Sequence, residues 1–154
     1  MSGAAPVARG WLLDTSVLSE CAPGKPAVAR AVADWLQREK DRLFIPCIAI
    51  AEIEQGICKL RRAGSSARVD HLSRWLDGLI ADHADSLLTL DVKCSRTLGK
   101  ISDAALAGGY HPGVSDVAIA AIAAHHDLIV LTRNLRHFEK LPVTAMDPFI
   151  ELPN

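Results

Sequence analysis

The chain has 154 residues, of which 49% are hydrophobic and 23% are charged, and its formal net charge at pH 7 is −1. Length and composition are typical of one globular domain with a single core, and they exclude a disordered or low-complexity chain. The nearly neutral charge excludes nucleic-acid binding through a global positive field, because proteins that bind in this way are usually basic.

Short apolar runs alternate with segments of helical periodicity. The predicted strands are residues 11–13, 43–45, 87–90, 129–131 and, more weakly, 143–145. After a helical stretch that follows Asp14, the predicted helices are residues 26–40, 50–60 (closed by Gly64), 69–81, 92–107, 115–125 and 135–140. This alternation predicts an α/β fold with a mostly parallel sheet. The strands are continuous apolar runs, which is typical of strands covered on both faces.

One domain is predicted over residues 1–154, with residues 1–9 as a flexible N-terminal segment. This segment lacks a basic start followed by a sustained apolar region, so it does not resemble a secretory signal. The longest apolar stretch, residues 117–124, is too short to cross a bilayer, and the predicted location is the cytoplasm. The cysteines form no C-x-x-C pair, which argues against a structural zinc site and favours reduced, mostly packed thiols; they are Cys21, Cys47, Cys58 and Cys94.

Acidic and polar residues follow the predicted strands at one edge of the sheet. Asp14 comes directly after the first strand, and Glu52 lies early in the helix after the second. Asp116 begins the helix that leads into the fourth strand, and Thr132 and Asn134 follow that strand. Because loops at the carboxyl edge of a parallel sheet build the site in such folds, we expect these segments to meet in one crevice.

Three carboxylates in one crevice repel each other unless a positive charge lies between them. Mg²⁺ or Mn²⁺ is the natural counter-ion, because these hard cations prefer oxygen ligands. Such an ion can activate a water molecule and neutralise charge on a phosphodiester. The pattern therefore predicts a metal site suited to phosphodiester hydrolysis.

Each acid also has a structural interpretation. Asp14 can cap the helix that follows it. Asp116 lies at a helix start, where the helix dipole favours a carboxylate. Helix geometry does not choose between Glu52 and Glu54, and either can be a solvated charge.

Three segments resemble the motifs of a known family: "LLDTSVLSE", "IAIAEIEQGI" and "SDVAIAAIAAHHDLIVLTRN". The chain resembles the PIN-domain ribonucleases, and among them the VapC-type toxins of type II toxin-antitoxin systems, with the FitB-like branch closest. The match runs from about Trp11 to Phe149 and assigns Glu52, in an E-x-x-x-G pattern, as the second acid. The remaining positions that match the motifs are Asp14, Gly56, Asp116, Thr132 and Asn134.

The resemblance implies a PIN-like three-layer α/β/α fold whose central, mostly parallel sheet has four to five strands. It implies an endoribonuclease that uses Mg²⁺, with Mn²⁺ as a substitute, held by Asp14, Glu52 and Asp116, with Asn134 as a fourth catalytic residue. Water attacks an RNA phosphodiester, for example in a tRNA or rRNA loop, and leaves a 5′-phosphate and a 3′-hydroxyl.

The resemblance also implies partners. Such proteins are usually homodimers, and a small VapB-like antitoxin silences them by placing its tail in the active site. Operator DNA is bound through the antitoxin, and no membrane partner is implied.

Two positions depart from the pattern. Some relatives have an acid where this chain has Asn134, and the neutral amide is a weaker ligand, which argues against a firmly held second metal. Many relatives have Asp where this chain has His137, which we interpret as a surface or helix-start residue. Ser16 fits a role beside the metal, although helix capping explains it equally well.

Other polar residues have mostly structural interpretations. Arg133 and Arg136 lie beside the expected crevice and are candidates for contacts with RNA phosphates. A basic cluster near a helix end is interpreted as a solvated face, with phosphate contact as the alternative; it comprises Lys59, Arg61, Arg62 and Arg68. His125 and His126 are adjacent on a helix and point about 100° apart, so they are not expected to share a metal.

Three other functions fit the sequence less well. A haloacid-dehalogenase-like phosphatase needs a second Asp two residues after the first, where this chain has Ser16. A dinucleotide-binding domain needs a G-x-G-x-x-G motif after the first strand, which is absent. A non-catalytic PIN scaffold or protein-interaction module would have lost acids, whereas three remain here.

Overall fold

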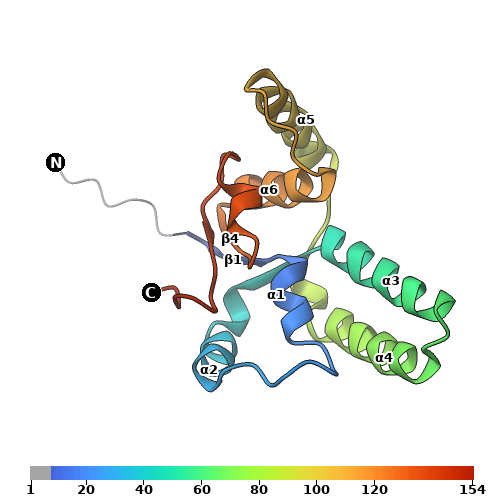
Figure 1. The fold of residues 1–154 in the computed structure, drawn as a ribbon. Helices are drawn as coiled ribbons and strands as arrows, with labels where there is room; N and C mark the ends of the chain where they lie inside the picture. The colour runs from blue at the N-terminus through green and yellow to red at the C-terminus, as the bar shows by residue number, and fades with distance from the viewer. Residues whose placement is uncertain (1–7) are drawn as a thin grey trace.

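The structure, a computed structural model, describes residues 8–154 and contains a central sheet of parallel strands (Figure 1). The strands are β1 (Gly10–Leu13), β2 (Leu43–Pro46), β3 (Leu87–Leu88), β4 (Leu128–Leu131) and β5 (Ala145–Met146). Their order in the sheet is β3-β2-β1-β4-β5, and every neighbouring pair is parallel. The predicted α/β fold with a mostly parallel sheet is therefore confirmed.

Helices cover both faces of the sheet and complete a three-layer α/β/α arrangement. One face carries α1 (Thr15–Glu20), α2 (Arg30–Arg38), α3 (Cys47–Arg62) and α4 (Ser66–Asp82). The other face carries α5 (Val92–Ala107), α6 (Val114–His126) and α7 (Leu135–Phe138). Short 3₁₀ turns, Lys40–Arg42 and Ala84–Ser86, lead into β2 and β3. In Figure 1, α3 and α4 form a hairpin on one side of the sheet, and α5 lies across α6 on the other.

Successive strand residues face opposite cores, as the strand period of two requires. Leu13 of β1 packs against α1–α4, whereas Leu12 packs against α5 and α6. Helix α6 is buried all along its middle, from Val117 to Ala123, because it lies between the sheet and α5. A helix that is apolar on all sides is typical of such a position, and its burial fixes where Asp116 lies.

Several predicted boundaries were wrong. Helix α2 begins at Arg30 rather than at residue 26, because the exposed residues before it gain no packing from a helical turn. Strand β3 ends at Leu88 rather than at residue 90, because its partner strand ends at Pro46, which has no N–H for a further hydrogen bond. Helix α7 is shorter than predicted, and β5 lies two residues later than its predicted start. The predicted boundaries of α5 are confirmed.

The described N-terminal residues begin beside the central strands. Residues 1–7 of the predicted flexible segment lie outside the described residues, while Arg9 donates its N–H to the Asp127 carbonyl over 3.0 Å. Between residues 8 and 154, no helix combines the length and the apolar character needed to cross a membrane. The single-domain assignment stays a prediction.

The strand order places the candidate site. From β1 the chain moves outward to β2 and β3, then returns to β4 on the other side of β1. Ligands in open α/β sheets bind beyond the carboxyl ends of the strands at such a reversal. Leu13 pairs with Leu131 in the ladder, so Asp14 and Thr132 leave the sheet side by side.

Candidate functional site

Asp14 is buried and tightly held at the carboxyl edge of the sheet. Its Oδ1 accepts a hydrogen bond from the Thr15 backbone N–H over 2.8 Å, so it does cap α1. Its Oδ2 accepts the hydroxyls of Ser16 and Thr132, each over 2.7 Å. A carboxylate has about four lone-pair positions, so capping leaves room for a further ligand on Oδ1.

Thr132 connects the two central strands through its hydroxyl. Its side chain is completely buried, donates to Asp14 Oδ2 and accepts the Asn134 backbone N–H over 3.0 Å. The Ser16 hydroxyl lies 3.3 Å from the Thr132 hydroxyl and accepts the Arg133 N–H over 3.0 Å. Together these contacts hold the loop after β4 against the start of α1 and fix the Asp14 carboxylate.

Glu52 lies on the first turns of α3 and faces the same edge. The Thr15 hydroxyl donates to its Oε1 over 2.9 Å, which ties α3 to α1. Glu54, two residues further along, is exposed and receives only a weak contact from the Cys58 thiol at 3.9 Å. Of the two glutamates, the structure therefore places Glu52 beside Asp14, in agreement with the family motif.

Asp116 lies in the first turn of α6 and is paired with His137. The Nδ1 of His137 lies 3.1 Å from Asp116 Oδ2, and the His137 side chain is 53% exposed. His137 is therefore more than the surface or helix-start residue that we expected, because it contacts one of the three acids directly. No signal in the sequence pointed to this imidazole partner.

The three acids are close enough to influence each other's ionisation. Burial raises the pKa of Glu52, the Thr15 hydrogen bond lowers it, and the charges of Asp14 and Asp116 raise it further. Burial also raises the pKa of Asp116, the His137 charge lowers it, and the Asp14 charge raises it. Carboxylates from three separate segments therefore lie within electrostatic reach of one another.

The donor set suits a hard divalent cation. Asp14, Glu52 and Asp116 offer carboxylate oxygens, and their mutual repulsion is the electrostatic condition that a cation relieves. In the described part of the chain these acids do not form a group with all ligand atoms within 4.8 Å of one another. Mg²⁺ keeps several waters in most protein sites, so carboxylates that surround it do not have to form a closed protein cage.

The remaining predicted residues lie around the acids. The side chain of Asn134 is exposed and makes no capping bond to α7. Arg133 is engaged elsewhere: its Nη1 lies 3.1 Å from Glu20 Oε1, and its guanidinium lies over the Phe149 ring at 5.0 Å. Arg136 is exposed on α7. Contact of Arg133 or Arg136 with RNA stays a prediction. The pairing of Arg133 with Glu20 could not be seen in the sequence.

A groove of about 210 Å³ opens beside the acids between α1, α3 and α4. Thr15 and Glu52 line its end nearest to Asp14, and Ile53, Ile57 and Trp75 supply apolar walls. Gly56 also lines the groove, and a Cβ atom there would meet nothing within 4 Å, so the glycine leaves this space open.

Comparison with known proteins agrees with this geometry. The PIN domain family model matches residues 11–143. The chain is 30% identical over 140 residues to the plasmid stability protein StbB of Pseudomonas syringae pv. tomato, covering 90% of this chain and 97% of StbB. It is 27% identical to the VapC ribonuclease Y4jK of Sinorhizobium fredii, covering 90% and 96%, and 29% identical to toxin FitB of Neisseria gonorrhoeae, covering 90% and 97%.

Among solved structures, the fold is similar to that of FitAcB from Neisseria gonorrhoeae. The TM-score is 0.78 at 27% sequence identity, covering 90% of this chain and 98% of that chain. The family model extends over the strands and helices that carry Asp14, Glu52 and Asp116. The chain therefore belongs to the PIN-domain family.

Proposed function

We propose that this chain is a metal-dependent endoribonuclease that acts as the toxin of a toxin-antitoxin pair. The observation that carries the proposal is the meeting of Asp14, Glu52 and Asp116 at the carboxyl edge, where each acid comes from a different connection of the sheet. The similarity to a VapC ribonuclease and to toxin FitB supports RNA as the substrate and toxicity as the biological role. Cytoplasmic RNA, with tRNA and rRNA loops as candidates, is the proposed target.

In this proposal the three carboxylates hold Mg²⁺, or Mn²⁺ in its place. The chemistry that the bound ion supplies is activation of water and neutralisation of charge on the phosphodiester. The chain's own residues position the ligands: Thr132 and Ser16 hold Asp14, Thr15 holds Glu52, and His137 holds Asp116. Asn134 is proposed as a neutral fourth residue at the rim of the site.

The groove beside Glu52 supports an antitoxin partner. Its apolar walls and its opening next to the acids suit an extended peptide whose end reaches the active site. Lys25 and Arg68 also line it, so acidic residues on the peptide would find partners there. The similarity to the FitAcB structure agrees with a VapB- or FitA-like partner.

A homodimer, and contact with operator DNA through the antitoxin, are proposed from the resemblance.

RNA cleavage is expected to need Mg²⁺ or Mn²⁺. A chelator should lower the rate with purified, antitoxin-free protein by at least about 10³-fold, and added Mg²⁺ should restore it, because the acids alone cannot activate water. The measurement is cleavage of structured RNA followed on denaturing gels, with end analysis for a 5′-phosphate. An unchanged rate in excess chelator would contradict the metal site.

Metal binding is also expected to stabilise the fold, independently of activity. Because Glu52 and Asp116 have raised pKa values, their ionised forms weaken the folded state at neutral pH, and a cation relieves this. Mg²⁺ should therefore raise the Tm of the parent and raise it less for Asp116→Asn. Equal shifts in both proteins would mean that the ion binds elsewhere.

Replacing His137 with Ala is expected to move the acid limb of the pH–rate profile to higher pH. His137 lowers the pKa of Asp116 by its charge and by its hydrogen bond, so its removal leaves Asp116 protonated up to a higher pH. Since the ionised carboxylate is the metal ligand, activity should fall first at mildly acidic pH. The measurement is the cleavage rate against pH, with His71→Ala, an exposed residue of α4, as the matched control. If the pH–rate profiles of His137→Ala and the parent superimpose, His137 does not influence the ionisation of Asp116 during cleavage.

A further inference from the structure

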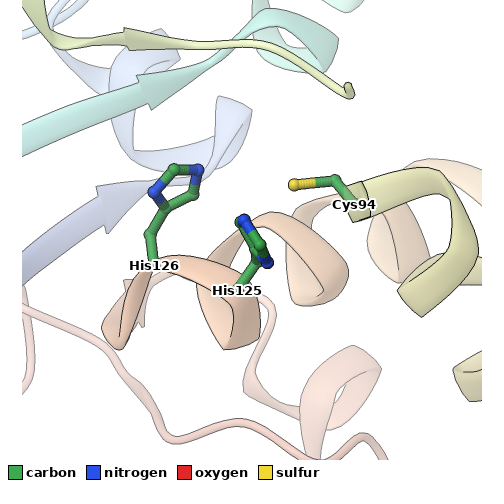
Figure 2. A group of neighbouring side chains, drawn as sticks. All are labelled: Cys94, His125 and His126. Carbon is green, nitrogen blue, oxygen red and sulfur yellow. The ribbon is translucent and has the colours of Figure 1, made fainter. Parts of the chain in front are cut away.

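A second cluster of metal-ligating side chains lies at the opposite end of α6 from the acids. Cys94 is the third residue of α5, and His125 and His126 are the last two residues of α6. One ligand atom from each of the three lies within 4.8 Å of the others. Figure 2 shows the Cys94 sulfur pointing from α5 toward the two imidazole rings on the last turn of α6. We propose that Cys94, His125 and His126 form a zinc site that is separate from the acidic site.

The two histidines approach each other more closely than their helical spacing suggests. Their ring centroids are 5.0 Å apart and the ring planes are nearly perpendicular, at 88°. The helix ends at His126, and Asp127 turns into the left-handed region with φ 55°, so no following turn confines the two side chains. Adjacent helical residues point about 100° apart and were not expected to share a metal, yet one ligand atom of each histidine lies within 4.8 Å of the other.

The ligand types select a borderline-soft cation. Thiolate sulfur and imidazole nitrogen are the ligands that Zn²⁺ prefers, whereas Mg²⁺ and Ca²⁺ prefer oxygen. Zinc bonds of about 2.0–2.3 Å in a tetrahedron place the ligand atoms roughly 3.3–3.6 Å apart. The ligand atoms lie at most 4.8 Å apart, so closing the cluster needs a movement of about 1 Å, which the exposed His125 side chain can supply by rotation.

The surroundings favour a cation and leave the imidazoles available. Neither imidazole ring takes part in a hydrogen bond within residues 8–154. Capping of the helix end therefore does not explain the positions of the two rings. The exposed Asp91 carboxylate accepts the Cys94 N–H over 2.8 Å and lies near enough to His125 to feel its charge. Arg9 lies over the Phe44 ring at 5.8 Å, and its charge is one of the causes that lower the pKa of His126, after burial and the His125 charge.

The cluster is distinct from the acidic site. Asp116 and His125 are nine residues apart on one helix, which separates their backbone positions by about 14 Å along the axis. Cys94 is completely buried where α5 packs on α6, so a metal here would join the start of α5 to the end of α6. The zinc proposal therefore does not depend on the proposed nuclease activity.

Metal titration of the full-length protein in excess Mg²⁺ tests the site. The parent is expected to bind one Zn²⁺, and His125→Ala and His126→Ala are each expected to weaken binding by at least about 100-fold. Co²⁺ in place of Zn²⁺ should give a thiolate-to-cobalt charge-transfer band in the near ultraviolet. That band should persist in Cys58→Ser, the matched thiol control on α3, and disappear in Cys94→Ser.

Two results would overturn the proposal. One is unchanged Zn²⁺ affinity in His125→Ala, a variant of an exposed residue that should fold normally. The other is loss of Zn²⁺ binding in Asp116→Asn, which would assign the zinc to the acidic site. If Cys94→Ser fails to fold because Cys94 is buried, the two histidine variants and the cobalt band of the parent still decide the question.

Discussion

Asp116→Asn is expected to lower the rate of RNA cleavage by roughly 10²–10³-fold while leaving the metal-free protein folded. The amide keeps the size of the side chain but removes the negative charge that holds the cation. Because burial and the Asp14 charge raise the pKa of Asp116, the ionised carboxylate disfavours the folded state at neutral pH. The neutral amide relieves this, so the Tm of the metal-free variant should equal or exceed that of the parent.

Asp14→Asn should lose as much activity but also lose stability. Asp14 Oδ2 accepts two hydroxyls and Oδ1 accepts a backbone N–H, and an amide offers only one accepting atom in place of two. The Thr15 N–H or the two hydroxyls then face an NH₂ group in place of an acceptor, and losing such a hydrogen bond typically costs about 1–3 kcal/mol. Thermal melting without metal separates this effect from the loss of catalysis.

Glu54→Gln is the matched control for both variants. Glu54 lies on the same helix as Glu52 but is exposed. The Glu54→Gln variant should therefore cleave RNA at the parent rate. Parent-like cleavage by Asp116→Asn, in an assay that still requires Mg²⁺, would place the catalytic ion away from this edge.

The positions of the acids could be predicted from the sequence because topology alone brings them together. Asp14 ends an apolar strand, and Asp116 begins the helix that feeds the neighbouring strand of a parallel sheet. Once the alternation of strands and helices is recognised, both residues must lie at the carboxyl edge. The positions of Asp14 and Asp116 can therefore be predicted without any knowledge of side-chain packing.

The partners of the acids could not be predicted in this way. The hydrogen bond from Thr15 to Glu52 joins residues 37 positions apart, and the His137–Asp116 pair joins two different helices. Such contacts depend on rotamers and on the angle between packed helices, which periodicity does not specify. The same limit applies to Arg133, whose position beside the site was predicted but whose pairing with Glu20 was not.

The cluster at the far end of α6 was missed for a related reason. Spacing rules search for ligands at fixed separations along one segment, such as C-x-x-C, whereas Cys94 lies 31 positions before His125 in the sequence. Only the packing of α5 on α6 brings the start of one helix close to the end of the other. Adjacent histidines at a helix end can therefore lie close to a cysteine on a neighbouring helix that is distant in the sequence.

Thr132→Val is expected to impair both stability and cleavage, although it changes no acid. Valine has nearly the same shape as threonine, so the completely buried site stays filled. The variant loses the donor to Asp14 Oδ2 and the acceptor for the Asn134 N–H. The free energy of unfolding should fall by about 1–3 kcal/mol, because buried polar groups lose their partners. Cleavage should fall about 10–100-fold, because Asp14 is no longer held in one orientation.

Thr132→Ser distinguishes positioning from simple destabilisation. Serine keeps the hydroxyl and removes only a buried methyl group, which should cost about 1 kcal/mol through the small cavity that is left. Urea unfolding should therefore place both variants below the parent, whereas cleavage at a temperature where all three are folded should separate them. We expect Thr132→Ser to cleave nearly as fast as the parent and Thr132→Val to cleave much more slowly. If the two variants cleave equally well, the hydroxyl does not orient Asp14, and the alignment of the site must come from Ser16 and the Thr15 N–H alone.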